Sequence, residues 1–97
     1  KQNSALTSND FTYNLDQNYP NPFNPTTTIN YSIAEDGIVT LEILNILGER
    51  IKILVNDFKT RGNHNISFNA SSLASGVYIY KIQSGDFITS KKMILLK

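Results

Sequence analysis

Hydrophobic and polar residues alternate along most of the chain after residue 26. A period of two residues indicates a β-strand with one buried face, and no stretch of ten residues carries a helical period. A weaker alternation covers Phe11–Leu15. The stronger segments are Thr27–Ile33, Ile38–Ile46, Arg50–Val55, His64–Asn69, Gly76–Ser84 and Asp86–Leu96. The pattern therefore predicts about seven short strands.

The alternation also predicts which side chains face the core. Successive side chains of a strand point to opposite faces, so apolar residues at every second position share one face. Leu44 and Ile46 add apolar weight to the other face of their strand, and we expect that strand to be covered on both sides near its end. The predicted inward sets are Ile29, Tyr31 and Ile33; Val39, Leu41 and Ile43; Ile51, Ile53 and Val55; His64, Ile66 and Phe68; and Tyr78, Tyr80 and Ile82.

Residues typical of turns separate these segments. Glu35-Asp36-Gly37 and Ser84-Gly85 predict hairpins, and Leu47-Gly48-Glu49 predicts a third turn. The polar stretch Asn56–Asn63 and the segment Ala70–Ser75 predict longer connections. Strands of this length with a turn signal roughly every 8–12 residues predict an all-β protein, an antiparallel β-sandwich. A small barrel is the competing architecture.

A proline-rich segment precedes the first strong strand. All three prolines of the chain, Pro20, Pro22 and Pro25, lie within six residues of one another. Each proline lacks an N–H donor and biases the preceding residue towards extended backbone, so a helix or a central strand is excluded here. We expect a stiff segment that is extended or turning, with Tyr19 and Phe23 as anchors.

Size, charge and cysteine content narrow the classes of function. A chain of 97 residues is one domain's worth, too short for most large enzyme folds. The net charge of +1 gives no overall field that favours nucleic acid or an anionic membrane. Residues 1–49 carry one Lys against six carboxylates, whereas residues 50–97 carry eight Lys and Arg against two. The absence of cysteine excludes disulfides and thiolate chemistry, and no apolar run is long enough to span a bilayer.

Few residues are candidates for chemistry. His64 is the single histidine, so a two-histidine metal site is excluded and His64 is interpreted as a strand residue. Glu35 and Asp36 fall in a turn, where Asp serves backbone geometry. We expect no cofactor. A weak calcium site built from Asp16, Asn18 and carbonyl oxygens is a lesser alternative, because the spacing of a calcium-binding loop is absent around Asp10 and Asp16.

Four strings of the sequence resemble one protein family. The segment 17–29, QNYPNPFNPTTTI, looks like the opening motif of the type A C-terminal sorting domain of type IX (Por) secretion cargo. LNILGE at 44–49 resembles a glycine turn of that family, and LASGVYIY at 73–80 resembles its Gly-x-Tyr-x-Tyr segment. KKMILLK at 91–97 is similar to its Lys-rich terminal motif. The matches follow the family's order from Leu15 to Lys97.

The resemblance implies a fold and a function. Such domains are immunoglobulin-like sandwiches, related in fold to a domain of flagellar hook-capping proteins, that direct an upstream cargo through the outer membrane for surface attachment or release. The implied partners are an outer-membrane translocon, shuttle proteins and a cell-surface sortase. We therefore expect residues 1–10 to be a linker from the cargo and residues 11–97 to be the sorting domain, in a protein exported through the periplasm to the cell surface or the medium.

The resemblance also carries site residues to this sequence. The terminal motif implies a sorting signal, and we hypothesise that the translocon reads it together with the adjoining sheet surface. The opening motif is expected to be structural first. The signal residues are Lys91, Lys92, Met93, Ile94, Leu95, Leu96 and Lys97, and the structural motif residues are Pro20, Asn21, Pro22, Phe23, Asn24, Pro25, Gly48, Gly76 and Tyr78.

Two other functions compete with this interpretation. A carbohydrate-binding or adhesive module of a secreted enzyme would need exposed, coplanar aromatic rings, with Tyr13, Tyr19, Phe58 and Tyr80 as candidates. A structural immunoglobulin-like domain in a flagellar or other surface assembly is a third possibility. The exposure of the four rings discriminates between the binding module and the sorting domain. Exposed, coplanar rings favour the binding module, and buried rings favour the sorting domain.

Overall fold

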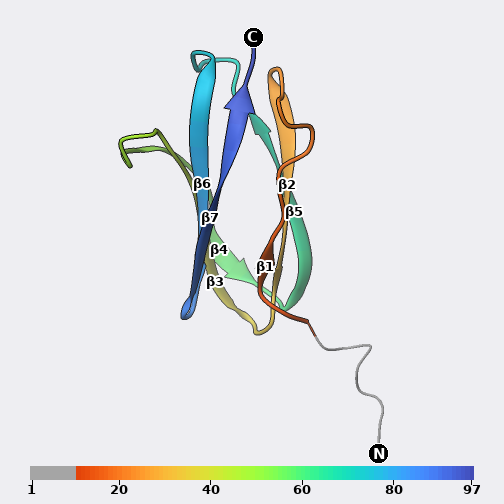
Figure 1. Ribbon diagram of the computed structural model, residues 1–97. Helices are drawn as coiled ribbons and strands as arrows, with labels where there is room; N and C mark the ends of the chain where they lie inside the picture. Colours follow the sequence, from red (N-terminus) through yellow and green to blue (C-terminus); the bar gives the residue numbers. More distant parts are fainter. Residues whose placement is uncertain (1–10) are drawn as a thin grey trace, which may run out of the picture.

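A computed structural model describes residues 11–97 as two antiparallel β-sheets packed face to face (Figure 1). The predicted linker, residues 1–10, lies outside the described residues. None of the described residues forms a helix that is long and apolar enough to cross a membrane. The strands are β1 (Asn14–Leu15), β2 (Thr26–Ile33), β3 (Gly37–Leu44), β4 (Arg50–Lys59), β5 (Gly62–Asn69), β6 (Gly76–Ser84) and β7 (Phe87–Leu95).

The strand order is that of an immunoglobulin-like sandwich. One sheet has the order β1-β2-β5 and the other β4-β3-β6-β7, with every strand pair antiparallel. The chain crosses between the sheets after β2, β4 and β5, and it forms hairpins at β3–β4 and β6–β7. A three-stranded sheet of the first, second and fifth strands opposite a sheet that contains the third, sixth and seventh follows the Greek-key connection of that fold. The predicted fold class is confirmed.

The core lies between the sheets where the alternation predicted it for most strands. Tyr80 and Ile82 on β6 are fully buried, as are Met93 and Leu95 on β7. These side chains interlock with the inward residues of the facing three-stranded sheet, which closes one continuous core. The other buried apolar residues are Leu15, Phe23, Ile29, Tyr31, Ile33, Val39, Leu41, Ile43, Val55, Phe68, Ala70 and Tyr78.

Strand β4 departs from the predicted alternation. Leu41 pairs with Val55, but the next residue of β3, Glu42, pairs with Ile53, which leaves Leu54 as an extra residue on β4. A second shift between Ile43 and Leu44 leaves Ile51 extra. Each bulge changes the face to which the following side chains point. The predicted inward set was therefore wrong in part: Val55 is buried, whereas Ile51 and Ile53 are about 40% exposed.

Four other predictions, on connections and strands, were wrong. Glu35-Asp36-Gly37 does not close a hairpin, because β2 and β3 belong to different sheets. The polar stretch Asn56–Asn63 is mostly strand, since polar residues also fit exposed strand positions. Only Asn14–Leu15 of the predicted first strand pairs with β2. Leu44 is half-buried and Ile46 is exposed in the turn, so β3 is not covered on both sides.

The β3–β4 turn is fixed by one asparagine. The Oδ1 of Asn45 accepts hydrogen bonds from the backbone N–H groups of Leu47 and Glu49, at 2.9 and 3.0 Å. The Asn45 side-chain amide donates to the Glu49 carboxylate at 2.7 Å. Gly48 has a positive φ of 84°, a conformation that residues with a Cβ rarely adopt. The turn is thus a defined loop at the tip of the hairpin, as the glycine predicted.

A buried tyrosine hydroxyl ties the amino-terminal segment to the four-stranded sheet. The Tyr80 hydroxyl donates to the backbone carbonyl of Asp16 at 2.7 Å and accepts from the backbone N–H of Asn18 at 2.8 Å. Loss of solvation on burial raises the pKa of Tyr80 to about 12. The neighbouring Asp16 carboxylate also raises this pKa, and the bond from Asn18 lowers it. The neutral phenol is therefore the form that the fold requires.

We predict that Tyr80→Phe destabilises the domain while leaving its fold intact. The substitution keeps the ring but removes the partner of the part-buried Asp16 carbonyl and of the buried Asn18 N–H, which costs about 1–3 kcal/mol of unfolding free energy. Chemical denaturation monitored by circular dichroism measures the loss. Tyr78→Phe is the matched control, because the Tyr78 hydroxyl makes one bond, to the Ala74 carbonyl at 2.6 Å. If the loss of unfolding free energy is no larger for Tyr80→Phe than for Tyr78→Phe, the Tyr80 hydroxyl does not have the proposed role in holding the amino-terminal segment.

The raised pKa of Tyr80 predicts alkaline unfolding. A group whose pKa is higher in the folded state than its ordinary value of 10 contributes stability that is present below pH 10 and is lost as pH rises towards 12. The free energy of unfolding should therefore fall between pH 10 and 12. Tyr80→Phe should show a shallower fall over that interval, and an equal slope in both proteins would refute the assignment.

Candidate functional site

The predicted sorting signal, residues 91–97, occupies the second half of β7 and the residues after it. Met93 and Leu95 point into the core and are fully buried, whereas Ile94 and Leu96 are partly exposed on the outer side. The register pairs Lys91 with the buried Tyr80 and Lys92 with Ile79. Cross-strand partners share a face, so the two neighbouring lysines lie on opposite faces of the sheet. The signal is therefore a folded edge strand with distinct inner and outer sides.

The proline-rich opening motif closes the outer edge of this strand. The Phe23 N–H donates to the Ile94 carbonyl at 2.9 Å, and the Leu96 N–H donates to the Phe23 carbonyl at 3.0 Å, which forms a short parallel bridge. The Asn21 side chain accepts from the Ile94 N–H at 2.9 Å. The Gln17 amide donates to the Lys92 carbonyl at 2.7 Å. On the edge of β7 that faces away from β6, the backbone groups from the Lys92 carbonyl to the Leu96 N–H are thus hydrogen-bonded within the molecule.

Phe23 anchors this cap in the core. Its side chain is 2% exposed and its ring lies 6.2 Å from that of Phe68 on β5, in a tilted arrangement. Tilted aromatic pairs at this separation add to the stabilisation from burial alone. The same residue therefore joins the core, the three-stranded sheet and the backbone of the carboxyl-terminal strand. Its packing confirms the expectation of an anchor at Phe23, whereas the same expectation for Tyr19 was wrong, because the Tyr19 side chain is 79% exposed.

The rest of the motif is hydrogen-bonded to the three-stranded sheet. Tyr19 pairs with Thr28 through two backbone hydrogen bonds, of 3.0 and 2.9 Å. The buried amide of Asn18 donates to the hydroxyl of Thr27 at 2.9 Å, and this hydroxyl donates to the Pro20 carbonyl at 2.8 Å. The motif thus runs from β2 of one sheet to β7 of the other. Since proline has no N–H, its presence at this edge leaves no unpaired donor.

The chain end is tied to the loop between β5 and β6. The Lys97 N–H donates to the Ser75 hydroxyl at 2.9 Å, and the Lys97 ammonium group donates to the carbonyls of Ser71 and Leu73, both at 2.7 Å. Gly76 begins β6 and pairs with Leu95. Residues 19 to 26 positions apart in the sequence therefore meet at one end of the sandwich, while Gly48 lies in the β3–β4 turn.

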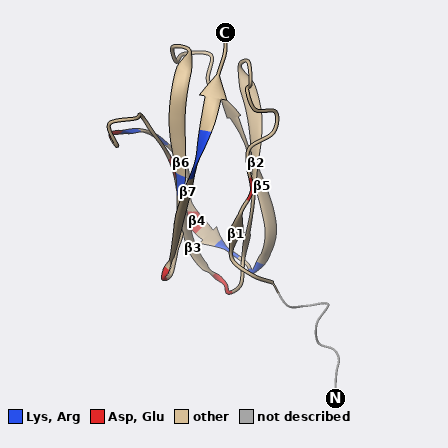
Figure 2. Cartoon of the chain, viewed as in Figure 1, with Lys and Arg blue, Asp and Glu red and all other residues tan. Residues whose placement is uncertain are grey.

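Charged side chains occur at several places along the molecule. Lys and Arg occur in the middle of β7 and on neighbouring strands, and carboxylates occur in loops at the end of the sandwich away from the carboxyl terminus, where Lys59 and Arg61 also lie (Figure 2). Those loops contain Glu35 and Asp36 before β3 and Asp86 before β7. The Asp36 carboxylate accepts from the backbone N–H of Arg61 at 2.7 Å, so it links two connections between the sheets. The terminal signal itself contributes three of the cations, Lys91, Lys92 and Lys97.

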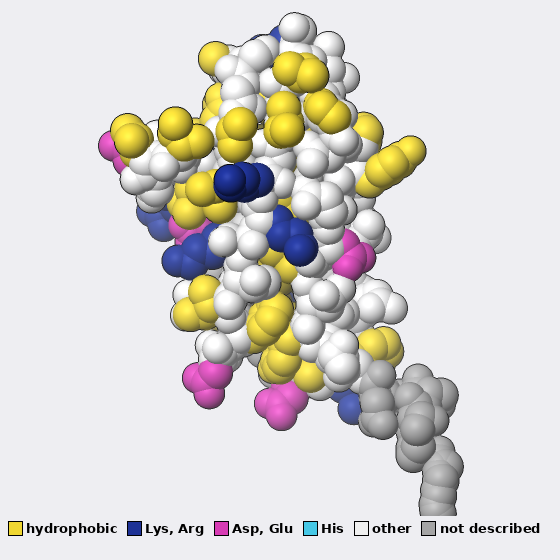
Figure 3. Space-filling view, viewed as in Figure 1, with side chains coloured by type: hydrophobic (Ala, Val, Ile, Leu, Met, Phe, Trp, Pro, Cys, Tyr) yellow, Lys and Arg dark blue, Asp and Glu magenta, His cyan; other side chains and the backbone are white. Residues whose placement is uncertain are grey.

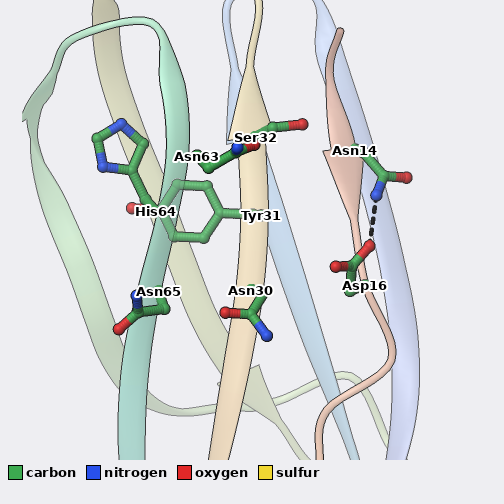
Figure 4. Close-up of a pocket in the computed structure, with 8 residues that line it drawn as sticks. All are labelled: Asn14, Asp16, Asn30, Tyr31, Ser32, Asn63, His64 and Asn65. Atoms are coloured by element: carbon green, nitrogen blue, oxygen red, sulfur yellow. Dashed lines mark hydrogen bonds between the residues drawn. The ribbon is translucent and has the colours of Figure 1, made fainter. Parts of the chain in front are cut away.

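A shallow polar pocket lies on the three-stranded sheet (Figure 4). It is lined by side chains from β1, β2 and β5, and Asp16 is its single carboxylate; the Asn14 amide donates to that carboxylate. In residues 11–97 no three His, Cys, Asp or Glu side chains gather closely enough to hold a metal ion. The Asn18 side chain bonds to Thr27 and Pro20. The weak calcium site at Asp16 and Asn18 stays a prediction, and Asp10 lies outside the described residues.

His64 lies on β5 and packs against neighbouring residues of the domain. The His64 ring stacks on Tyr31, with ring centroids 5.4 Å apart, and its Nε2 lies 2.6 Å from the Thr60 carbonyl. Burial raises the pKa of Tyr31.

The four rings proposed for a sugar platform do not assemble. Tyr80 is buried, and Tyr13 stacks on Phe87 with ring centroids 5.1 Å apart. Tyr19 is exposed beside β2, whereas Phe58 is exposed on β4 of the other sheet. The absence of an exposed coplanar set favours the sorting domain over the binding module.

Comparison with known proteins agrees with this geometry. No curated protein matches the chain. The family model described as "Secretion system C-terminal sorting domain" matches residues 17–96, which begin at the opening motif and end within the terminal motif. The match spans both of the segments that are hydrogen-bonded to each other at the edge of β7. The chain therefore belongs to the family of secretion system C-terminal sorting domains.

Proposed function

We propose that this domain acts as a folded export address, read by the outer-membrane translocon and its shuttle proteins at residues 91–97. The family to which the chain belongs implies an upstream cargo and an interaction with the type IX machinery. The observation that carries the proposal for these residues is the cap: the opening motif bonds the backbone of Lys92, Ile94 and Leu96. The two most specific motifs of the sequence therefore form one physical unit.

The cap supports reading of the signal in its folded form. A hydrophobic strand at an open edge would pair with other chains. Here Met93 and Leu95 are buried and the edge is closed, so the signal crosses the periplasm without exposing a template for aggregation. The side chains of Lys92, Ile94 and Leu96 nonetheless face outward, where a receptor has access to them.

The domain would act by binding and not by catalysis. A cell-surface sortase would remove it and attach or release the cargo at the surface. The sortase would cut at or before the start of the sandwich, because the segment from Asp16 onward is held by backbone and side-chain bonds. These steps place the mature cargo on the cell surface or in the medium.

We predict that deletion of residues 91–97 abolishes export. A reporter that carries a secretion signal and this domain at its carboxyl terminus, expressed in a host with a type IX system, should reach the surface or medium. The truncated fusion should stay in the periplasm. Cell fractionation with immunoblotting measures the distribution, and surface delivery of the truncated fusion would refute the proposed function.

The deletion also removes core residues, so a milder variant separates recognition from folding. Leu96→Ser changes an exposed side chain and retains Met93 and Leu95 in the core. It should reduce delivery while leaving the melting temperature within a few degrees of that of the parent. Full delivery of Leu96→Ser together with full delivery of the deletion would exclude residues 91–97 as the signal.

We predict that the opening motif acts through stability. Asn21→Ala removes the acceptor for the Ile94 N–H and should lower the free energy of unfolding by about 1 kcal/mol. Tyr19→Ala is the control within the motif, because this side chain is 79% exposed. Thermal denaturation gives the stabilities and reporter fractionation gives the delivery. Loss of delivery by Asn21→Ala or Pro22→Ala at an unchanged melting temperature would show instead that the motif is itself read.

A further inference from the structure

The two sheets present outer faces of opposite character. On the three-stranded sheet, the outward positions are occupied by short polar side chains, among them Asn30, Ser32, Asn63 and Asn65. A sheet with one solvated face ordinarily shows such residues there. On the four-stranded sheet the outward positions include many aliphatic side chains. The residues on this outer face are therefore not those of an ordinary solvent-exposed sheet face.

The strand register places these aliphatic residues together. Leu44 of β3 pairs with Ile79 of β6, and Val77 of β6 pairs with Ile94 of β7. Val77 and Ile94 are 41% and 37% exposed. The alternate positions of these strands, which include Ile43 and Tyr78, point into the core. The four side chains thus form one contiguous apolar group on the outside of the sheet.

Cations surround this group on the same face. The register pairs Leu44 with Arg50 on β4 and Ile79 with Lys92 on β7. Lys81 follows along β6 and pairs with Glu42, which is the one carboxylate among these rows. The group and its charged rim are called the apolar–cationic face: Leu44, Val77, Ile79 and Ile94, with Arg50, Lys81, Lys92 and Glu42. Figure 3 shows Lys and Arg side chains among hydrophobic ones on the side that carries β7.

Both edges of the four-stranded sheet are unfavourable for the addition of a further strand beside this face. The opening motif bonds the outer edge of β7 beside this face. The opposite edge strand, β4, has bulges at Ile51 and Leu54, and bulges prevent regular pairing. Recognition by an added strand is therefore disfavoured at both edges. The side-chain surface between the two edges is what the sheet offers to a partner.

We propose that the apolar–cationic face is a protein-docking surface whose partner carries an apolar patch rimmed by carboxylates. The inference rests on the proposed function and deepens it, because it extends recognition from the terminal motif to β3 and β6. Three cations against one carboxylate call for a partner surface of net negative charge. Aliphatic residues in the middle with charges at the rim are the arrangement found in protein–protein interfaces.

The shape of the face favours a protein over a lipid surface. Interfacial membrane binding requires apolar side chains that reach about 5–10 Å into the headgroup region. Here Val77 and Ile94 are only about two-fifths exposed, and the charged residues Lys81 and Lys92 lie on the same face of the sheet. Such a surface fits a protein partner that presents apolar and charged groups at matching positions.

The test uses residues outside the terminal motif. Val77 and Lys81 lie on β6, outside residues 91–97, so a receptor that reads the terminal residues as an extended peptide does not contact them. Val77→Ser and Lys81→Glu in the reporter fusion should each reduce delivery at least fivefold, and Lys81→Gln should reduce it less. Ser67→Glu is the control, since it places a carboxylate on the polar face of the other sheet, makes the same change in net charge as Lys81→Gln, and should leave delivery unchanged.

Stability measurements keep the test interpretable. Lys81 pairs with Glu42, so Lys81→Glu also places two carboxylates side by side, and the loss of delivery counts only if the melting temperature of the variant matches that of Ser67→Glu within a few degrees. If it does not, the Val77→Ser and Lys81→Gln results decide. Normal delivery by both of these variants, with the 91–97 deletion retained in the periplasm, would overturn the docking face and leave the proposed function standing. Delivery of the deletion fusion would instead refute the proposed function.

A vesicle experiment distinguishes the two kinds of surface. The purified domain is mixed with vesicles of phosphatidylglycerol and phosphatidylcholine and separated by flotation. We expect no co-flotation at physiological salt. Co-flotation that Val77→Ser or Lys92→Glu abolishes would overturn the assignment to a protein partner and identify an anionic lipid surface as the occupant.

Discussion

The attachment of Phe23 to the carboxyl-terminal strand is the contact on which the rest of the arrangement depends. Its ring is buried against Phe68, and its backbone bonds to Ile94 and Leu96. A core position thereby fixes the place of a proline-rich segment that has no regular structure of its own. Without this anchor, the segment would have to be held at the edge by exposed hydrogen bonds, which contribute little against the entropy of a free chain.

The anchor decides how the carboxyl-terminal strand meets its surroundings. Strands at the edge of a sheet expose backbone groups, and natural proteins cover or disrupt such edges. This domain uses both devices on the same sheet, a cap of side-chain and backbone bonds on β7 and two bulges in β4. The consequence is that side chains, not backbone, provide the accessible surface around the terminal motif. A receptor that reads this surface reads three strands at once.

Much of the fold and part of the site could be predicted from residue patterns. The alternation in β2, β3 and β6 gave the inward residues because strict alternation permits only one choice of face. The proline spacing indicated a stiff non-helical segment with Phe23 as an anchor. In β4 the same reasoning failed at Ile51 and Ile53, because bulges change the face and leave no mark in the spacing of residues. Glu35-Asp36-Gly37 has the composition of a hairpin turn, but that composition does not specify which sheet the next strand joins.

The sequence by itself determined the class of protein: its alternating segments predict an all-β fold, and its four motifs in order resemble one family. Only the tertiary structure decided that the first and last of these motifs touch. The bonds of Gln17 and Asn21 reach β7 more than seventy residues further along the chain, and nothing local to either segment encodes this contact. The same is true of the apolar–cationic face, whose members come from different strands. Its outline depends on the pairing register, and the register is set by the packing of the whole core.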